Sequence, residues 1–312
     1  MQAIAIDGYG GLDKLRLREL PLPEPKADEV RIRIRAAGVG IWDAKQRTGA
    51  FPPEHEAFPM VVGAECSGTV DAVGDNVHAP LHEGDEVYTY FYGDQGAYAQ
   101  YVCVKAEDVA LKPKNLSFIE AAAVPVDGIT AHQALVDDLQ VAAGQTVLIA
   151  GASGGVGTMA VQIAAKTLKA GVIATAGKTN LDYVRQLGAG DVVDYTAGDF
   201  VAGVKRIAPA GVDAALDCVG KDDNAKMTIA AVRDGGRLAE LVGEEVPAER
   251  GIRIAHIESE PSAKRLDTLR TFFENGTLRV EIAQTFPLAE ARKAQEAIET
   301  GHTRGKIVLV VD

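Results

Sequence analysis

The sequence predicts an α/β fold in which a doubly wound parallel sheet follows a β-rich first part. Three observations support this prediction. Short strand-like segments separated by glycine turns fill residues 1 to about 120. From about residue 121, apolar β-rich runs alternate with helical segments, as in parallel βαβ units. One such run, Thr146–Ala150, leads through the turn Gly151–Gly157 into a helix, which is the first half of a dinucleotide-binding βαβ unit.

The first part of the chain is predicted to form a compact barrel or sandwich of short strands. Its strands are expected at Met1–Ile6, Leu15–Glu19 and Glu29–Ala36, with a proline-rich break between the last two. The third strand alternates charged and apolar residues, which places Arg31, Arg33 and Arg35 on one face. We interpret that face as solvated; an anion site is the alternative.

The second part is predicted to alternate strands and helices, and no internal repeat interrupts it. Two alanine-rich helices are expected before the glycine turn, at Ile119–Pro125 and Gly128–Val136. After it we expect strand Gly171–Ala176, helix Asn180–Leu187, strands Asp191–Tyr195, Val212–Cys218, Arg237–Val242 and Ile252–Ile257, helix Ala263–Asn275, a strand around Arg279–Ile282, helix Leu288–Thr300 and strand Lys306–Val311.

Composition limits the possible partners and compartment. The 312 residues suffice for two domains, and the net charge of −12 with a pI near 5.0 argues against nucleic acid or an anionic membrane surface as partner. Three cysteines without paired spacing indicate a reducing compartment. Neither a signal peptide nor an apolar run of about 20 residues is visible. A cytoplasmic protein without a membrane partner is therefore expected.

The glycine turn has a mechanical explanation. Gly154 and Gly155 remove side chains where the backbone would approach a pyrophosphate, and Gly157 lets the helix pack closely on the strand. The amides at the start of the helix would then point at the phosphates. Ala152 stands at the first glycine position of the usual G-x-G-x-x-G pattern, so a tight turn without a ligand is the alternative.

Longer strings resemble the zinc-independent quinone oxidoreductase and enone reductase group of the medium-chain dehydrogenase/reductase superfamily, whose members are zinc-type alcohol dehydrogenase-like. The strings are GDEVY from Gly84, GAYAQYV from Gly96, LSFIEAAAVPVDGITAHQAL from Leu116, GASGGVG from Gly151, DCVG from Asp217, DGGRL from Asp234 and GHTRGKIVL from Gly301. The resemblance implies a GroES-like catalytic domain at 1–122, a Rossmann domain at 123–258 and a C-terminal segment at 259–312 that rejoins the first. It also implies a homodimer.

The resemblance further implies catalysis without a metal. Zinc alcohol dehydrogenases of the superfamily bind their metal through strings resembling GxCxxD and GHE. This sequence has Gly40 and Ala64 at those ligand positions, Val126 at the third, and too few cysteines for a structural zinc lobe. None of these three side chains can bind zinc. His78 and His82 are separated by Pro80, so they do not share a helix face.

The expected cofactor is NADPH (NADP+). The second strand ends in Gly177-Lys178-Thr179, without the carboxylate that an NAD-preferring unit uses. An ammonium group favours a 2′-phosphate, and Tyr195 aligns with a family tyrosine that contacts this phosphate. An exposed lysine beside an edge-packed tyrosine is the alternative. Cofactor contacts are predicted at Thr130, Ala152, Ser153, Gly154, Gly155, Val156, Gly157, Lys178, Tyr195, Val219, Leu241, Val242 and Arg304.

The reaction implied by the resemblance is hydride transfer to a quinone or an α,β-unsaturated carbonyl compound. Asp43-Ala44-Lys45 matches a D-x-K element of several enone reductases, so Lys45 is expected to donate to the cofactor ribose or the substrate carbonyl. A surface lysine is the alternative. Many members carry asparagine where Gly40 stands and tyrosine where Phe51 stands. Because both polar side chains are lost, Trp42, Phe51, Tyr90 and Phe91 are expected to line an apolar pocket. Ordinary core packing of these side chains is the alternative.

Two functions remain open from the sequence. No residue is a convincing general acid, so water is the expected proton donor, and His132 and His256 are interpreted as packed side chains. Retention of Lys45, Lys178 and Tyr195 favours an enzyme. The loss of polar groups at positions 40 and 51 leaves an NADPH-binding protein of the same fold without significant turnover as the alternative.

Overall fold

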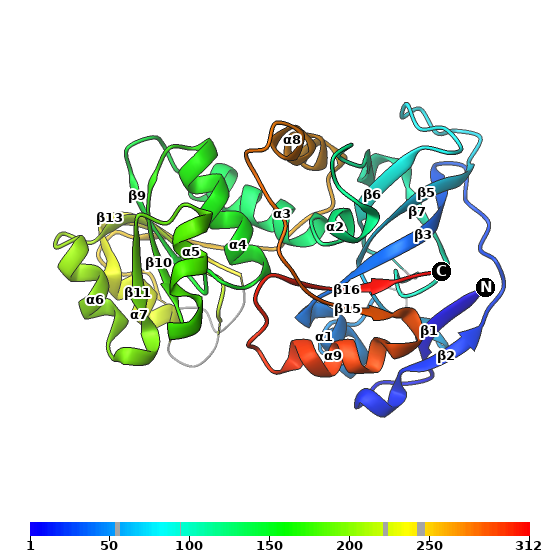
Figure 1. Cartoon of the computed structure of the whole chain (residues 1–312), viewed down its shortest axis with the longest axis horizontal. Coiled ribbons are helices and arrows are strands. Elements are labelled where there is room, and N and C mark those ends of the chain that lie inside the picture. The colour runs from blue at the N-terminus through cyan, green and yellow to red at the C-terminus, as the bar shows by residue number, and fades with distance from the viewer. Residues whose placement is uncertain (54–56, 94, 221–223, 242–246) are drawn as a thin grey trace. The chain divides into compact units, whose positions relative to one another are not determined.

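The chain folds into two compact units (Figure 1). The computed structural model describes residues 1–53, 57–93, 95–220, 224–241 and 247–312. One unit combines Met1–Ile129 with Pro261–Asp312, and the other is Thr130–Glu260. These boundaries lie a few residues beyond the expected domain limits, and helix α3 (Pro125–His132) contains the first of them. The second unit is thus inserted into the first.

The first unit is built on two sheets. The larger has the order β15-β16-β3-β5-β6-β8, with β7 paired to β3, and the smaller has the order β2-β1-β4. The strands are β1 (Gln2–Ile6), β2 (Arg16–Glu19), β3 (Glu29–Val39), β4 (Met60–Val61), β5 (Glu65–Val73), β6 (Glu86–Tyr90), β7 (Tyr101–Lys105), β8 (Val109–Leu111), β15 (Ile282–Pro287) and β16 (Lys306–Val310).

The long strand β3 organises this unit. Along one edge it pairs first with β7 and then with β16, and along the other it pairs with β5. Its buried residues alternate with exposed Arg33 and Arg35, which agrees with the interpretation of a solvated face. Arg31 on the same face donates from Nε to Asp71 Oδ2 at 2.7 Å. The strand predicted at Arg279–Ile282 is wrong except for its last residue, because pairing with β16 begins only at Ile282.

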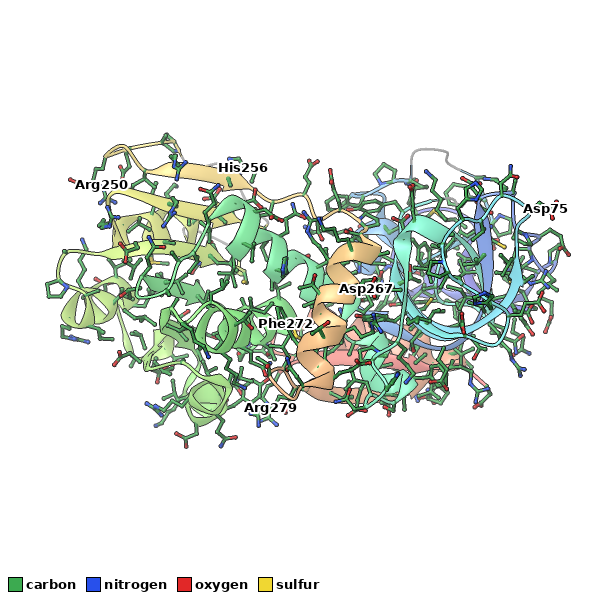
Figure 2. All side chains as sticks on the ribbon, turned by 90° about the horizontal axis from the view of Figure 1, so that it is seen from above. Asp75, Arg250, His256, Asp267, Phe272 and Arg279 are labelled. Atoms are coloured by element: carbon green, nitrogen blue, oxygen red, sulfur yellow. The ribbon has the colours of Figure 1, made fainter. Side chains whose placement is uncertain are left out.

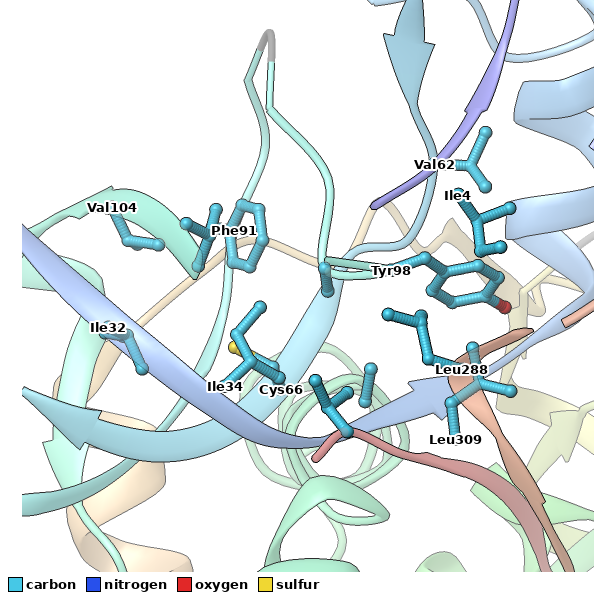
Figure 3. Packing of buried hydrophobic residues seen from close by; sticks show 14 of the residues in the cluster. Ile4, Ile32, Ile34, Val62, Cys66, Phe91, Tyr98, Val104, Leu288 and Leu309 are labelled. Atoms are coloured by element: carbon cyan, nitrogen blue, oxygen red, sulfur yellow. The ribbon is translucent and has the colours of Figure 1, made fainter. Parts of the chain in front are cut away.

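Helices of the first unit pack on these sheets around an apolar core. Figure 3 shows Ile4, Val62, Leu288 and Leu309 around the ring of Tyr98 in that core. The α-helices are α1 (Ile41–Thr48), α2 (Phe118–Ala122), α8 (Ala263–Glu274) and α9 (Ala291–Glu299), with short 3-10 turns η1 (Leu12–Lys14), η2 (Ala106–Asp108) and η7 (Leu288–Glu290). Asp267 and Phe272, labelled in Figure 2, lie on α8.

The second unit confirms the predicted doubly wound parallel sheet. Its six strands have the order β11-β10-β9-β12-β13-β14, and every neighbouring pair is parallel. They are β9 (Thr146–Ala150), β10 (Gly171–Ala176), β11 (Asp191–Asp194), β12 (Val212–Asp217), β13 (Val232–Glu240) and β14 (Arg253–His256). The strand order reverses between β9 and β12, which is where such sheets bind ligands.

Helices lie on both faces of this sheet (Figure 1). They are α4 (Gly155–Gln162), α5 (Leu181–Leu187), α6 (Phe200–Ile207) and α7 (Asn224–Ala231), with turns η3 (Gln133–Asp138), η4 (Ile163–Thr167), η5 (Lys178–Asn180) and η6 (Tyr195–Ala197). Within the described ranges, the helices are all too short or too polar to cross a membrane.

Candidate functional site

The glycine turn after β9 is fastened to the neighbouring strand β10. Gly151 has a φ of 74°, a conformation that glycine adopts without strain. Its N–H donates to Thr175 Oγ1 at 3.2 Å, and the N–H of Ala152 donates to the Thr175 carbonyl at 3.1 Å. A Cβ on Gly157 would lie 2.3 Å from the Gly151 carbonyl oxygen. Only glycine at position 157 therefore lets α4 begin this close to the turn.

The start of α4 offers donors to an anion. Gly154 is the N-cap residue in extended conformation, and Gly155 and Val156 form the first turn with Gly157. The first N–H groups of a helix have no intrahelical acceptor, so they can bind phosphate oxygens. A Cβ on Gly154 would meet only the Gly151 carbonyl, at 3.6 Å, so the space beside Gly154 is open. Ser153 accepts a hydrogen bond from Asn180 Nδ2 at 3.3 Å, which joins the turn to the end of β10.

Lys178 and Tyr195 lie together at the carboxyl ends of β10 and β11. Ala176 is paired with Asp194 across the two strands, so the residues that follow them leave the sheet at one edge. The Tyr195 hydroxyl lies 3.4 Å from where a Gly177 Cβ would be, and Tyr195 is 50% exposed. Hydrogen bonds from Thr196 lower the pKa of Asp194, and the charge of Lys178 adds to this effect. The Lys178 ammonium and the Tyr195 phenol thus lie exposed at the edge where these two strands end.

Strands β12 and β13 bring Val219 and Leu241 to the same edge. Asp217, buried at the end of β12, accepts from the Val219 N–H at 2.8 Å and from Asn224 Nδ2 at 2.7 Å. The Leu241 N–H donates to the Asp217 carbonyl at 3.2 Å. Val242, also predicted to contact the cofactor, lies outside the described residues.

Two further residues predicted to contact the cofactor belong to other elements of the chain. Thr130 is buried in α3, at the first residue of the second unit. Arg304 belongs to the first unit, where it lines a cavity of about 240 Å³ with Thr300 and His302. Its guanidinium forms an ion pair with Glu281 at 2.9 Å.

Helix α1, which was not expected from the sequence, carries the D-x-K element. Gly40 is its N-cap residue and donates its N–H to Asp43 Oδ2 at 2.9 Å. The same oxygen accepts from the Tyr98 hydroxyl at 2.9 Å, and burial raises the pKa of Asp43 to about 6. At the other end, Arg47 donates to Gln295 Oε1 at 3.0 Å on α9. Asp43 therefore caps and anchors the helix on which Lys45 lies.

Three of the four predicted catalytic residues lie at two places in the first unit. Lys45 is half-buried and its Nζ lies 5.3 Å from the ring centroid of Phe51, which is 58% exposed. Tyr90 is buried at the end of β6 and makes an edge contact and a hydroxyl hydrogen bond with Tyr92. Phe91 packs in the main core, as the alternative of ordinary core packing expected for this residue.

Trp42, the fourth predicted catalytic residue, covers a buried charge cluster that sequence reasoning missed. Lys306 Nζ lies 4.3 Å from the indole centroid, 2.5 Å from Glu65 Oε1 and 3.0 Å from Asp127 Oδ2. Burial raises the pKa of Glu65 to about 7. Burial lowers the pKa of Lys306, but Asp127 and Glu65 outweigh that effect and the net change is a rise. The available signal was that Asp127 and Lys306 stand inside the family-like strings, and that Glu65 directly follows Ala64 in the segment that corresponds to GHE.

A zinc ion does not fit the residues of this region. Gly40, Ala64 and Val126 have no ligand atoms in their side chains, and the N–H of Val126 donates to Glu65 Oε2 at 2.8 Å. In the described part of the chain, no three His, Cys, Asp or Glu side chains are arranged to hold a metal ion.

Two family models match the chain. The alcohol dehydrogenase GroES-like domain matches residues 26–114, and the zinc-binding dehydrogenase model matches residues 187–309. The first match confirms the GroES-like assignment of the N-terminal part.

Individual relatives span both units. The chloroplastic NADPH-dependent alkenal/one oxidoreductase of Arabidopsis thaliana is 33% identical over 99% of this chain and 79% of its own length. A crystal structure of Escherichia coli quinone oxidoreductase complexed with NADPH superposes with a TM-score of 0.90 at 26% identity, covering 99% of this chain and 100% of the other. A crystal structure of an NAD-dependent alcohol dehydrogenase superposes with a TM-score of 0.92 at 35% identity, covering 100% of both chains.

Proposed function

The chain belongs to the quinone and enone oxidoreductase group of the medium-chain dehydrogenase/reductase superfamily, and from this membership we propose an NADPH-dependent reductase. It is an oxidoreductase that transfers hydride to a quinone or an α,β-unsaturated carbonyl compound. The proposal adds the cofactor, the residues and a homodimeric cytoplasmic form to that assignment.

One observation carries the choice of NADPH over NADH. Lys178 and Tyr195 lie together after β10 and β11, and the end of β10 has no carboxylate to repel a phosphate. An NAD-preferring unit would have Asp or Glu at that place. Relatives of both kinds exist, since one similar structure contains NADPH and another is NAD-dependent. The residues of this chain support NADPH, because a lysine without a neighbouring carboxylate at the end of β10 favours the 2′-phosphate.

The remaining roles follow from the chemistry of the side chains. The N–H groups after Gly154 bind the pyrophosphate. Val219 and Leu241 contact the cofactor farther along the edge of the sheet. When bound, the nicotinamide supplies the hydride. Lys45 donates a hydrogen bond to the acceptor oxygen as negative charge develops there, and water supplies the proton. Phe51 holds the Lys45 side chain through the contact of its ring with the ammonium.

Reduced-cofactor absorbance with a panel of quinones and enones tests this function. NADPH should be consumed with at least one acceptor class, and NADH much more slowly at equal concentration. Tight NADPH binding without consumption by any acceptor would contradict the enzyme and support a cofactor-binding protein. Preference for NADH would contradict the cofactor assignment.

A further inference from the structure

The indole of Trp42 occupies the space that a side chain at position 40 would need. A Cβ on Gly40 would lie 2.1 Å from Cζ2 and 2.2 Å from Cε2 of Trp42. Carbon atoms that are not bonded do not approach this closely, so no residue larger than glycine fits while the ring keeps its place. The ring of residue 42 therefore replaces the side chain of residue 40 at the start of α1.

The face of this ring contacts the ammonium of Lys306. Its Nζ lies 4.3 Å from the indole centroid, within the range of a cation–π contact, and Lys306 is only 4% exposed. The indole Nε1 is buried and has no hydrogen-bond partner within the described residues. The orientation of the ring thus depends on packing and on the cation–π contact rather than on a hydrogen bond from its N–H group.

Lys306 is itself held by residues from two other elements. Glu65 begins β5 and Asp127 lies in the first turn of α3, and both carboxylates contact the ammonium. Glu65 has room because Gly38 has no side chain: a Cβ there would lie 2.5 Å from Glu65 Oε1. Strands β5 and β16 and helix α3 therefore meet at one buried cation beneath the first turn of α1.

We propose that Lys306 is a positioning residue of the acceptor site, acting through Trp42. The cluster of Lys306, Glu65 and Asp127 fixes the indole, and the indole fixes the start of α1, the helix that carries Lys45 in its last turn. A buried ammonium thus orders the region in which zinc enzymes of the superfamily have their metal ligands. The inference rests on the proposed function, in which Lys45 and Trp42 belong to the acceptor site.

The main variant is Lys306→Met, which keeps an unbranched apolar chain and removes the charge. Acceptor kcat/KM should fall on the order of 100-fold, because small displacements of reacting groups have effects of that size. The KM for NADPH should not change. Trp42 is the only tryptophan of the chain, so its emission maximum and its quenching by acrylamide report directly on the ring. Both should change in the folded variant.

A matched control separates positioning from general destabilisation. Lys112 is also buried in the first unit, lies 5.4 Å from the ring centroid of Phe118 and pairs with Glu86 at 3.1 Å. Lys112→Met should lower stability without changing Trp42 emission or acceptor kinetics. Equal kinetic losses in the two lysine variants would overturn the proposal.

A double-mutant cycle tests whether Lys306 acts through the indole. In a Trp42→Ala background, Lys306→Met should lower acceptor kcat/KM little further, since the element it orients is gone. Additive losses, or unchanged emission in folded Lys306→Met, would overturn the proposal. If Lys306→Met does not fold, Lys306→Met/Glu65→Gln, which removes two of the three buried charges, is measured in its place.

The fluorescence measurements do not depend on catalytic turnover. A protein that consumes no acceptor would contradict the proposed function, whereas emission and quenching would still show whether Lys306 holds Trp42.

Discussion

Lys178 is the residue on which cofactor choice should depend most. Lys178→Ala should weaken NADPH binding about 1.5–3 kcal/mol more than NADH binding, because a charge-assisted hydrogen bond to the 2′-phosphate is lost. Fluorescence or calorimetric titration with both cofactors measures the difference. Lys205→Ala, which removes an exposed lysine of α6, is the matched control. Equal losses of binding affinity for NADPH and NADH in Lys178→Ala would contradict the assignment of NADPH as the cofactor.

Asp43 should make stability depend on pH near neutrality. Burial is the main cause of its raised pKa; hydrogen bonds from Gly40 and Tyr98 and the charge of Lys306 oppose it, and Asp127 adds to it slightly. The folded chain therefore binds this proton more tightly than the unfolded chain. The resulting stabilisation is complete below a pH of about 4 and is lost as the pH rises through about 6.

Asp43→Asn removes this titration and keeps the shape of the cap. Between about pH 5 and about pH 7.5, the free energy of unfolding of the parent should fall by about 1 kcal/mol relative to the variant. Urea unfolding at both pH values provides the measurement. Parallel pH dependence in the two proteins would show that the buried carboxyl does not hold a proton in this range.

Residues with local signals could be predicted, and residues joined only by the fold could not. Gly157 and Lys178 stand at fixed offsets from strand ends, so a strand pattern and a spacing suffice to single them out, and Tyr195 is singled out by its resemblance to a family tyrosine. Lys306, Glu65 and Asp127 come from three distant segments. Their carboxylates and ammonium carry no spacing signal, and a buried charge looks in sequence like a surface charge.

At the scale of an element, two glycines of the turn before α4 should respond differently to alanine. Gly157→Ala would place a Cβ 2.3 Å from the Gly151 carbonyl oxygen and should lower the free energy of unfolding by about 1–3 kcal/mol. Gly154→Ala meets nothing closer than 3.6 Å, so the protein should stay stable. Its methyl group would instead occupy the place of the pyrophosphate and weaken NADPH and NADH alike.

Chemical unfolding and cofactor titration of the two alanine variants provide the comparison. Unchanged cofactor affinity in Gly154→Ala would mean that the pyrophosphate does not bind at this turn. Unchanged stability in Gly157→Ala would mean that the turn and helix α4 can move apart at little cost in free energy.

Elements were predicted well where hydrophobic periodicity was strong. Strands β9 and β10 have their predicted limits, and β12 ends one residue before its predicted end. Helix α1 was missed because its short sequence IWDAKQRT shows little periodicity and begins after a glycine cap. Strand β15 was misplaced because it is a mostly exposed edge strand, whose polar residues give no alternating apolar signal.

For the whole molecule, NADPH should stabilise the second unit. At a concentration about 100 times its Kd, a ligand that binds only the folded state adds about 2.7 kcal/mol to the free energy of unfolding. Hydrogen exchange should then slow across Thr130–Glu260, most strongly at Gly151–Gly157. NADH at the same concentration should protect these amides less. Protection by NADPH confined to other segments would contradict the cofactor site.

The insertion of the second unit into the first has a consequence for biosynthesis. Residues 130–260 are continuous, so this unit can fold as soon as they leave the ribosome. The first unit must wait, because β3 pairs with β16 and the cation under Trp42 belongs to the first residue of β16. A nascent chain that stops before Lys306 would therefore contain the whole parallel sheet of the second unit while β3 still lacks its partner β16, so the proposed cofactor site would be complete before the proposed acceptor site.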